Sequence, residues 1–111
     1  MKAGLTCDVV IIGAGQAGLG VSYYLTRGGV PHRVLERGRI GETWRTQRWD
    51  SFMMNSPNFM TVMPDAPYRG PEPEGFFSLR EMTDQFEAFA RRNRLPVESG
   101  IAVSAVEQLD G

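Results

Sequence analysis

The sequence predicts an α/β fold built on a parallel sheet, and three observations carry this prediction. A continuous β-branched run, Val9-Val10-Ile11-Ile12, is typical of a strand buried on both faces of a parallel sheet. The segment 17–29 has apolar residues near helical spacing and stops at Gly28-Gly29, a common helix C-terminus. Pro31 prevents the helix from continuing, and residues 32–36 (HRVLE) read as a second short strand. Residues 7–36 therefore form one predicted βαβ unit.

The rest of the chain is predicted to add a loop, a helix and a strand. Residues 37–77 form a long loop-like segment rich in Trp, Met, Phe and Asn, and its 64–75 part is rich in proline and glycine. Ser78 and Glu81 have the spacing of a capping box, so a helix should begin there and end near Asn93. Residues 101–106 (IAVSAV) read as a strand. Residues 78–111 are thus the helix-and-strand part of an incomplete parallel sheet.

Composition excludes several classes of function. The chain has 111 residues, a size that indicates one domain, and its net charge of −1 argues against nucleic acid or an anionic membrane as a partner. No apolar stretch reaches the roughly 18–20 residues of a membrane span. The single cysteine, Cys7, excludes an internal disulfide and a CxxC site, so we expect a reduced, cytoplasmic protein. No residue pattern indicates a metal site.

Three glycines follow the first strand with the spacing G-x-G-x-x-G. Gly13 permits a tight turn out of the strand, and Gly15 leaves room for a pyrophosphate beside the backbone. Gly18 allows the helix to pack closely on the strand, and the helix then directs its free N–H groups at the phosphates. Glu36 ends the second strand and is placed to accept hydrogen bonds from the ribose hydroxyls of an adenosine. These residues predict a Rossmann-type unit that binds either FAD or NAD.

A family resemblance favours FAD. The segments GAGQAG, LER, GETW, RWDS and NSP, in this order, resemble flavin-containing monooxygenase-like flavoproteins, which use FAD and NAD(P)H. The resemblance runs from Asp8 to about Glu107. It implies that the chain is the FAD-binding N-terminal part of a flavin-dependent, NAD(P)H-using monooxygenase-like oxidoreductase that acts on a small molecule. The NAD(P)H site would lie outside this chain.

The resemblance also implies where FAD would bind. The glycine turn would hold the pyrophosphate, the strand-end acid the ribose, and a valine backbone the adenine. The tryptophan of GETW would lie near the flavin, and the NS pair of NSP near its reactive edge. The implied cofactor-binding set is Gly13, Ala14, Gly15, Gln16, Ala17, Gly18, Glu36, Arg37, Thr43, Trp44, Asn55, Ser56 and Val103. No catalytic residue is assigned.

Two departures from the family pattern refine the prediction. Relatives often have paired glycines where this chain has Gly41-Glu42, and Baeyer–Villiger oxygenases typically have Asp where Asn55 stands. The second departure favours heteroatom oxidation, or a flavoprotein of unassigned substrate, over ketone oxidation. Two alternatives stay open: a non-catalytic FAD-binding partner subunit of a split flavoprotein, and a fragment of an NAD-dependent dehydrogenase. In each case we expect the chain to need the remainder of the protein or a partner chain, and the sequence does not identify a substrate.

Overall fold

The computed structural model describes residues 6–46, 48–49 and 51–109. The elements follow the order β1 (Val9–Ile12), α1 (Gln16–Arg27), β2 (His32–Glu36), α2 (Glu42–Thr46), α3 (Leu79–Arg92) and β3 (Val97–Ser99). None of the helices in these described ranges is long and apolar enough to cross a lipid bilayer. The α/β class and the βαβ unit predicted from the sequence are confirmed.

The three strands form one parallel sheet with β2 in the middle. Val9 to Ile12 of β1 pair in register with His32 to Leu35 of β2, and Val34 to Glu36 of β2 pair with Val97 to Ser99 of β3. All three strands therefore end at the same edge of the sheet. The chain leaves β1 into the glycine turn at that edge, and it leaves β2 there immediately after Glu36.

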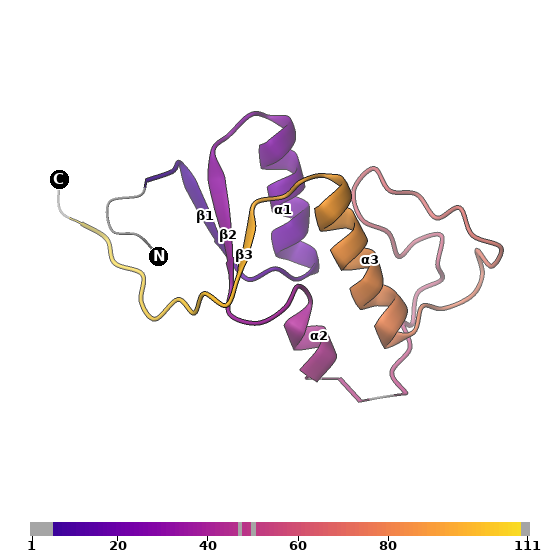
Figure 1. The fold of residues 1–111 in the computed structure, drawn as a ribbon. Helices are drawn as coiled ribbons and strands as arrows, with labels where there is room; N and C mark the ends of the chain where they lie inside the picture. Colours follow the sequence, from indigo (N-terminus) through magenta and orange to yellow (C-terminus); the bar gives the residue numbers. More distant parts are fainter. Residues whose placement is uncertain (1–5, 47, 50, 110–111) are drawn as a thin grey trace.

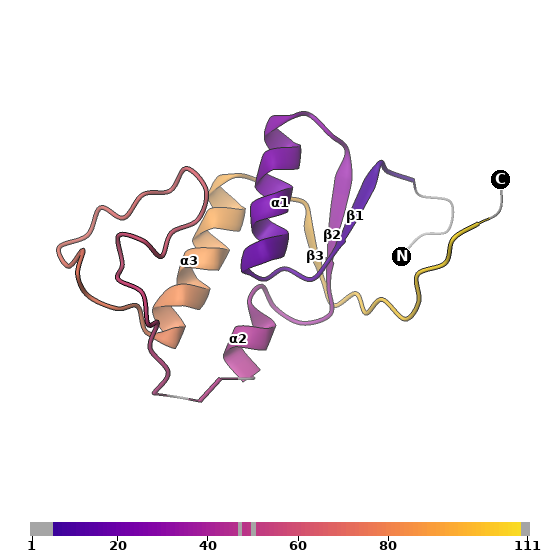
Figure 2. The same ribbon diagram turned by 180° about the vertical axis from the view of Figure 1, so that it is seen from behind.

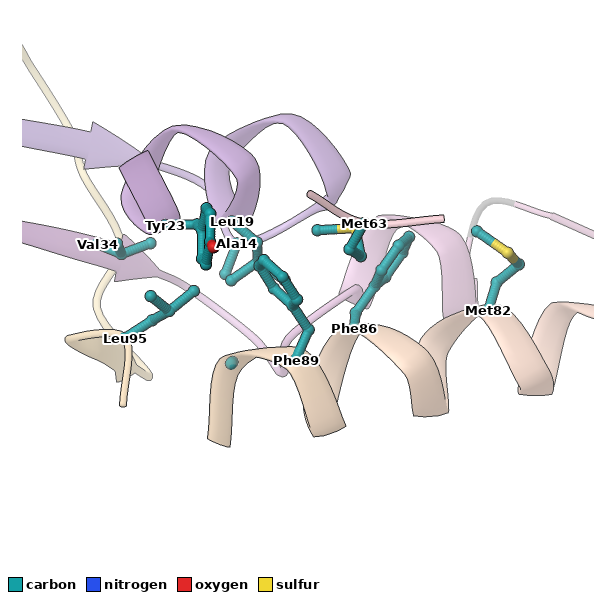
Figure 3. Close-up of a cluster of buried hydrophobic side chains, with 10 residues drawn as sticks. Ala14, Leu19, Tyr23, Val34, Met63, Met82, Phe86, Phe89 and Leu95 are labelled. Carbon is teal, nitrogen blue, oxygen red and sulfur yellow. The ribbon is translucent and has the colours of Figure 1, made fainter. Parts of the chain in front are cut away.

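Helices α1 and α3 pack together on one side of the sheet, as Figures 1 and 2 show from opposite directions. Their facing side chains form the core, in which Leu19 of α1 and Phe86 and Phe89 of α3 are fully or almost fully buried. Val34 of β2 joins this cluster from the sheet (Figure 3). Burying a large apolar side chain of this kind contributes roughly 1.5–3 kcal/mol. The core therefore fixes both helices relative to β2.

Both long helices begin and end where the sequence predicts. Gly28 is the C-cap of α1, and Gly29 follows with a φ of +68°, which favours glycine. Ser78 caps α3: its side chain accepts the N–H of Glu81, and the Glu81 carboxylate accepts the N–H of Ser78. The capping box is thus complete.

The other face of β1 departs from the prediction. Val10 and Ile12 are 51% and 57% exposed, whereas the β-branched run predicts burial on both faces. The reason is that α1 and α3 both cover the opposite face, and no element within the described residues packs over these two side chains. Strand β1 is therefore half-buried and lies at an edge of this sheet.

The third strand lies at a different position from the one predicted from the sequence. The prediction at 101–106 is wrong: the strand is Val97–Ser99, and residues 101–109 have no regular structure. A strand needs a paired neighbour, and β2 ends at Glu36, which pairs with Ser99. Gly100 then turns the chain with a φ of +76°, and the Ile101 N–H makes a last bond to the Glu36 carbonyl. The predicted 37–77 loop also contains one short helix, α2.

Candidate dinucleotide-binding site

The glycine turn after β1 is open to solvent where a ligand would approach it. Gly13 has a φ of +102°, in the left-handed region that favours glycine. A Cβ placed on Gly13 or on Gly15 would meet no atom within 4 Å. A Cβ on Gly18 would lie only 2.1 Å from the Gly13 carbonyl oxygen. The first two glycines therefore leave empty space, and the third brings α1 close to β1.

No side chain within residues 6–46, 48–49 and 51–109 caps the N-terminus of α1. Its N-cap is Gly15, which has no side chain to accept the first N–H groups, and its first turn contains no acidic residue. The free N–H groups and the helix dipole leave positive potential at this end. A helix N-terminus of this kind, at the end of a glycine turn, is a common binding site for phosphate. The chemistry of the turn therefore fits a pyrophosphate.

Glu36 connects the end of β2 to the glycine turn. One carboxylate oxygen accepts the N–H of Ala14 at 2.9 Å, and the other accepts the N–H of Gly38 at 2.7 Å. A carboxylate has about four lone-pair positions, so both oxygens keep capacity for further donors such as hydroxyl groups. The sequence predicts only one role for Glu36, the binding of the ribose hydroxyls of a ligand. Its second role, the fixing of two backbone loops, could not be read from the sequence.

The backbone of Ala14 extends the hydrogen bonds of Glu36 toward α2. Ala14 is fully buried, and its carbonyl oxygen accepts the N–H of Gly41 at 2.9 Å. Gly41 has a φ of +72°, and a Cβ there would lie 3.1 Å from Phe86. Gly38 and Gly41 thus belong to the backbone network around the turn, and the sequence analysis did not select them. The signal was present, because both glycines stand in the short segment between the strand-end acid and the tryptophan.

Glu42 takes the place of the second glycine of the family pattern and makes a local ion pair. Its carboxylate accepts hydrogen bonds from the Arg39 side chain at 2.8 and 3.0 Å and from the Arg39 N–H at 2.9 Å. These bonds from Arg39 lower the pKa of Glu42 from 4.5 to about 2. A Cβ on Gly38 would overlap the Glu42 side chain at 2.5 Å. The pair therefore ties the start of α2 to the loop after β2.

Two adjoining cavities flank the glycine turn. One, of about 290 Å³, is lined by Ile12, Gly13, Leu35, Glu36, Arg37, Thr43, Ile101, Ala102 and Val103. The other, of about 600 Å³, is lined by Ile12, Gly13, Gly15, Gln16, Ala17, Gly18, Thr43 and Trp44. The two share Ile12, Gly13 and Thr43, so they form one continuous surface along the carboxyl edge of the sheet. Binding crevices of open α/β sheets lie at this edge.

Most of the predicted residues line these two cavities. Glu36, Arg37 and Val103 are in the smaller cavity, with Thr43 at the junction, and Gln16, Trp44 and the second and third glycines are in the larger one. Ala14 lies beneath the turn and contributes its peptide group.

Asn55 and Ser56 are not brought to either cavity. Asn55 is exposed, and the Ser56 hydroxyl lies 3.0 Å from the Thr61 hydroxyl. Their role at a flavin stays a prediction. A third cavity, of about 670 Å³, lies between residues 62–69 and α3 and contains none of the predicted residues.

Comparison with known proteins agrees with this geometry. Residues 6–55 match the family model described as an FAD binding domain. The chain is 32% identical over 104 residues to an uncharacterized oxidoreductase CzcO-like protein of Geobacillus kaustophilus, covering 93% of this chain and 29% of that protein. It is 36% identical over 66 residues to the probable indole-3-pyruvate monooxygenase YUCCA3 of Arabidopsis thaliana, which covers 59% of this chain and 15% of that protein.

A solved structure shows the same arrangement. The chain superimposes on a mutant flavin monooxygenase from Stenotrophomonas maltophilia with a TM-score of 0.82 and 29% identity, over 94% of this chain and 31% of that one. The chain is similar to flavin monooxygenases in sequence and in fold. This flavin monooxygenase-like chain spans less than a third of the length of each of these relatives. Its matched region contains the glycine turn, Glu36 and Trp44.

Proposed function

We propose that this flavin monooxygenase-like chain holds FAD by its pyrophosphate and adenosine, as the FAD-binding part of an NAD(P)H-using monooxygenase-like oxidoreductase. The observation that carries the proposal is the space above Gly15, which is free of protein atoms and lies beside an uncapped helix N-terminus. That space adjoins a second cavity with Glu36 at its wall.

Each wall of the site has a distinct task in this proposal. The N–H groups at the start of α1 hold the pyrophosphate, and Glu36 accepts hydrogen bonds from the ribose while it keeps the Ala14 N–H in place. The backbone near Val103 borders the adenine. Thr43 and Trp44 border the half of the ligand beyond the turn, and Asn55 and Ser56 are assigned to its reactive edge. FAD itself would supply the redox and oxygen chemistry, and the protein holds and shields it.

The acid at position 36 also bears on which nucleotide is accepted. A carboxylate at the ribose repels a 2′-phosphate, so the site disfavours NADP. NAD carries no such phosphate and is the competitor that the experiment must exclude. The substrate of the intact enzyme is a small molecule, in line with the monooxygenase relatives. A cytoplasmic location is part of the proposal and is supported by the single thiol of Cys7.

The decisive experiment compares two glycine substitutions in the same chain. Gly15→Ala adds a methyl group that meets no protein atom, so the fold should be kept while the phosphate space is filled. Gly20→Ala is the matched control, since its Cβ would be 3.9 Å from Pro64, an ordinary contact. We expect the wild-type chain and the control to retain flavin absorbance after loading with FAD and desalting, and Gly15→Ala to lose it.

Three results would contradict the proposal. A wild-type chain that cannot be loaded with FAD would show that these residues do not form a usable half-site. Equal retention of FAD by Gly15→Ala and the control would show that the glycine turn is not the binding surface. Saturable binding of NAD without binding of FAD would favour the dehydrogenase alternative.

A further inference from the structure

Trp44 is held on several sides by other side chains. Its ring meets Phe52 and Phe86 edge-on, with centroids 5.8 and 5.6 Å apart and interplanar angles of 76°. The guanidinium carbon of Arg48 lies over the indole, 4.8 Å from its centroid, and 5.6 Å from the centroid of Phe52. Both distances are within the roughly 6 Å range of a cation–π interaction, which is strongest for tryptophan. The indole is therefore positioned by one cation and two aromatic rings.

Arg48 differs in its contacts from Arg39 and Arg45, the two arginines that most closely precede it in the sequence. Arg39 forms an ion pair with Glu42, and Arg45 forms one with Glu87 of α3 at 2.7 Å. Arg48 instead covers one face of Trp44, so the ring meets the larger cavity with its other face or its rim.

Trp44 and Glu36 belong to different halves of the site. Trp44 lines the larger cavity together with the glycine turn, and Glu36 lines only the smaller one. A dinucleotide with its adenosine against Glu36 and its pyrophosphate on the turn places its second half in the cavity of Trp44. That half is absent from ADP and present in FAD.

We propose that Arg48 is a positioning residue for the flavin half of the site: it fixes the Trp44 indole, and through this ring it strengthens the binding of FAD but not of ADP. The inference rests on the proposed function. It assigns to Arg48 a contact with the ring and none with the ligand. The role of Arg48 therefore differs from that of Glu36, which binds the adenosine half of the ligand.

Binding of two ligands to three variants tests this inference. Arg48→Met keeps an extended apolar side chain but removes the cation, Arg48→Lys restores a cation, and Arg80→Met on α3 is the control, since the Arg80 side chain is 90% exposed. We expect Arg48→Met to weaken FAD binding by about twofold to thirtyfold, the range of a lost cation–π interaction. ADP binding should be unchanged in all variants, and Arg48→Lys should recover part of the FAD affinity.

The outcomes separate this inference from the proposed function. Unchanged FAD affinity in Arg48→Met would overturn the inference alone, and the proposed function would stand. Equal weakening of FAD and ADP would also overturn it, because that pattern indicates a general loss of structure. A wild-type chain that binds ADP and not FAD would overturn both this inference and the proposed function. A wild-type chain that binds neither ligand would overturn both proposals.

A spectroscopic measurement tests the contact without any ligand. The chain has two tryptophans, so Trp49→Phe leaves Trp44 as the single fluorophore. We expect Arg48→Met in this background to show faster local motion of the indole in fluorescence anisotropy decay, with Arg48→Lys intermediate. Identical decays in the presence and absence of the arginine would show that Arg48 does not fix the ring, and would overturn the inference.

Discussion

Replacement of Gly18 by alanine tests the close approach of α1 to β1. The added Cβ would lie 2.1 Å from the Gly13 carbonyl oxygen and 3.2 Å from both the Gly13 carbonyl carbon and a methyl group of Ile11. Favourable non-bonded contacts lie at about 3.5–4.0 Å, so the first of these is too short by more than about 1 Å. The overlapping oxygen belongs to the backbone of the glycine turn and cannot rotate away. Helix α1 must therefore move.

The size of the effect follows from two opposing terms. Overpacking of this kind costs about 1–3 kcal/mol, and a rigid backbone neighbour places it toward the upper end. Alanine in place of glycine inside a helix contributes roughly 0.5–1 kcal/mol in the opposite direction. Gly20→Ala, two residues along the same helix, receives only the favourable term because its nearest neighbour would be 3.9 Å away.

Urea unfolding followed by far-ultraviolet circular dichroism measures the difference. We expect Gly18→Ala to be less stable than Gly20→Ala by about 2–3 kcal/mol, which is the cost of the overlap alone because both variants gain the same helix term. Gly18→Ala should also lose affinity for adenine nucleotides, since the turn is displaced. If the two variants are equally stable, the reasoning about close helix–strand packing is wrong.

Two further predictions follow from the hydrogen bonds of the helix ends. Glu42 has a lowered pKa of about 2, so its pairing with Arg39 stabilises the fold above the ordinary pKa of 4.5 and is lost as the pH falls toward 2. The melting temperature of Glu42→Gln should therefore be below that of the wild type at neutral pH and converge with it at low pH; a constant difference would contradict this. Ser78→Ala removes the cap of α3 and should lower the free energy of unfolding by about 1 kcal/mol. Urea denaturation measures this loss, and an unchanged midpoint would show that the cap contributes nothing.

The elements predicted correctly are those whose signals are local. The β-branched run, the Gly28-Gly29 end of α1 and the Ser78 cap of α3 act within a few residues of where they stand, so the sequence contains them in full. The third strand depends on a partner far along the chain. Residues 97–99 (VES) look less like a strand than residues 101–106, but only the former lie beside β2.

The site shows the same division. The glycine spacing and the strand-end acid predicted the turn and Glu36, because each residue type is required at its own position. The N–H groups of Ala14 and Gly38 donate hydrogen bonds to Glu36 from positions 22 and 2 residues away, and no pattern in the sequence predicts these bonds. Helix α2 has only five residues and packs against α3, so it carries no periodicity that could predict it.

The backbone of Ala14 connects the walls of the two cavities. Its N–H is bound by Glu36 beside one cavity, and its carbonyl binds Gly41 at the start of the segment that carries Trp44 beside the other. These two groups belong to consecutive peptide planes that meet at the Ala14 Cα, and Ala14 is fully buried. A displacement of this backbone would therefore disturb both hydrogen bonds, and with them a wall of each cavity. The two halves of the site are thus built on one buried residue of the glycine turn.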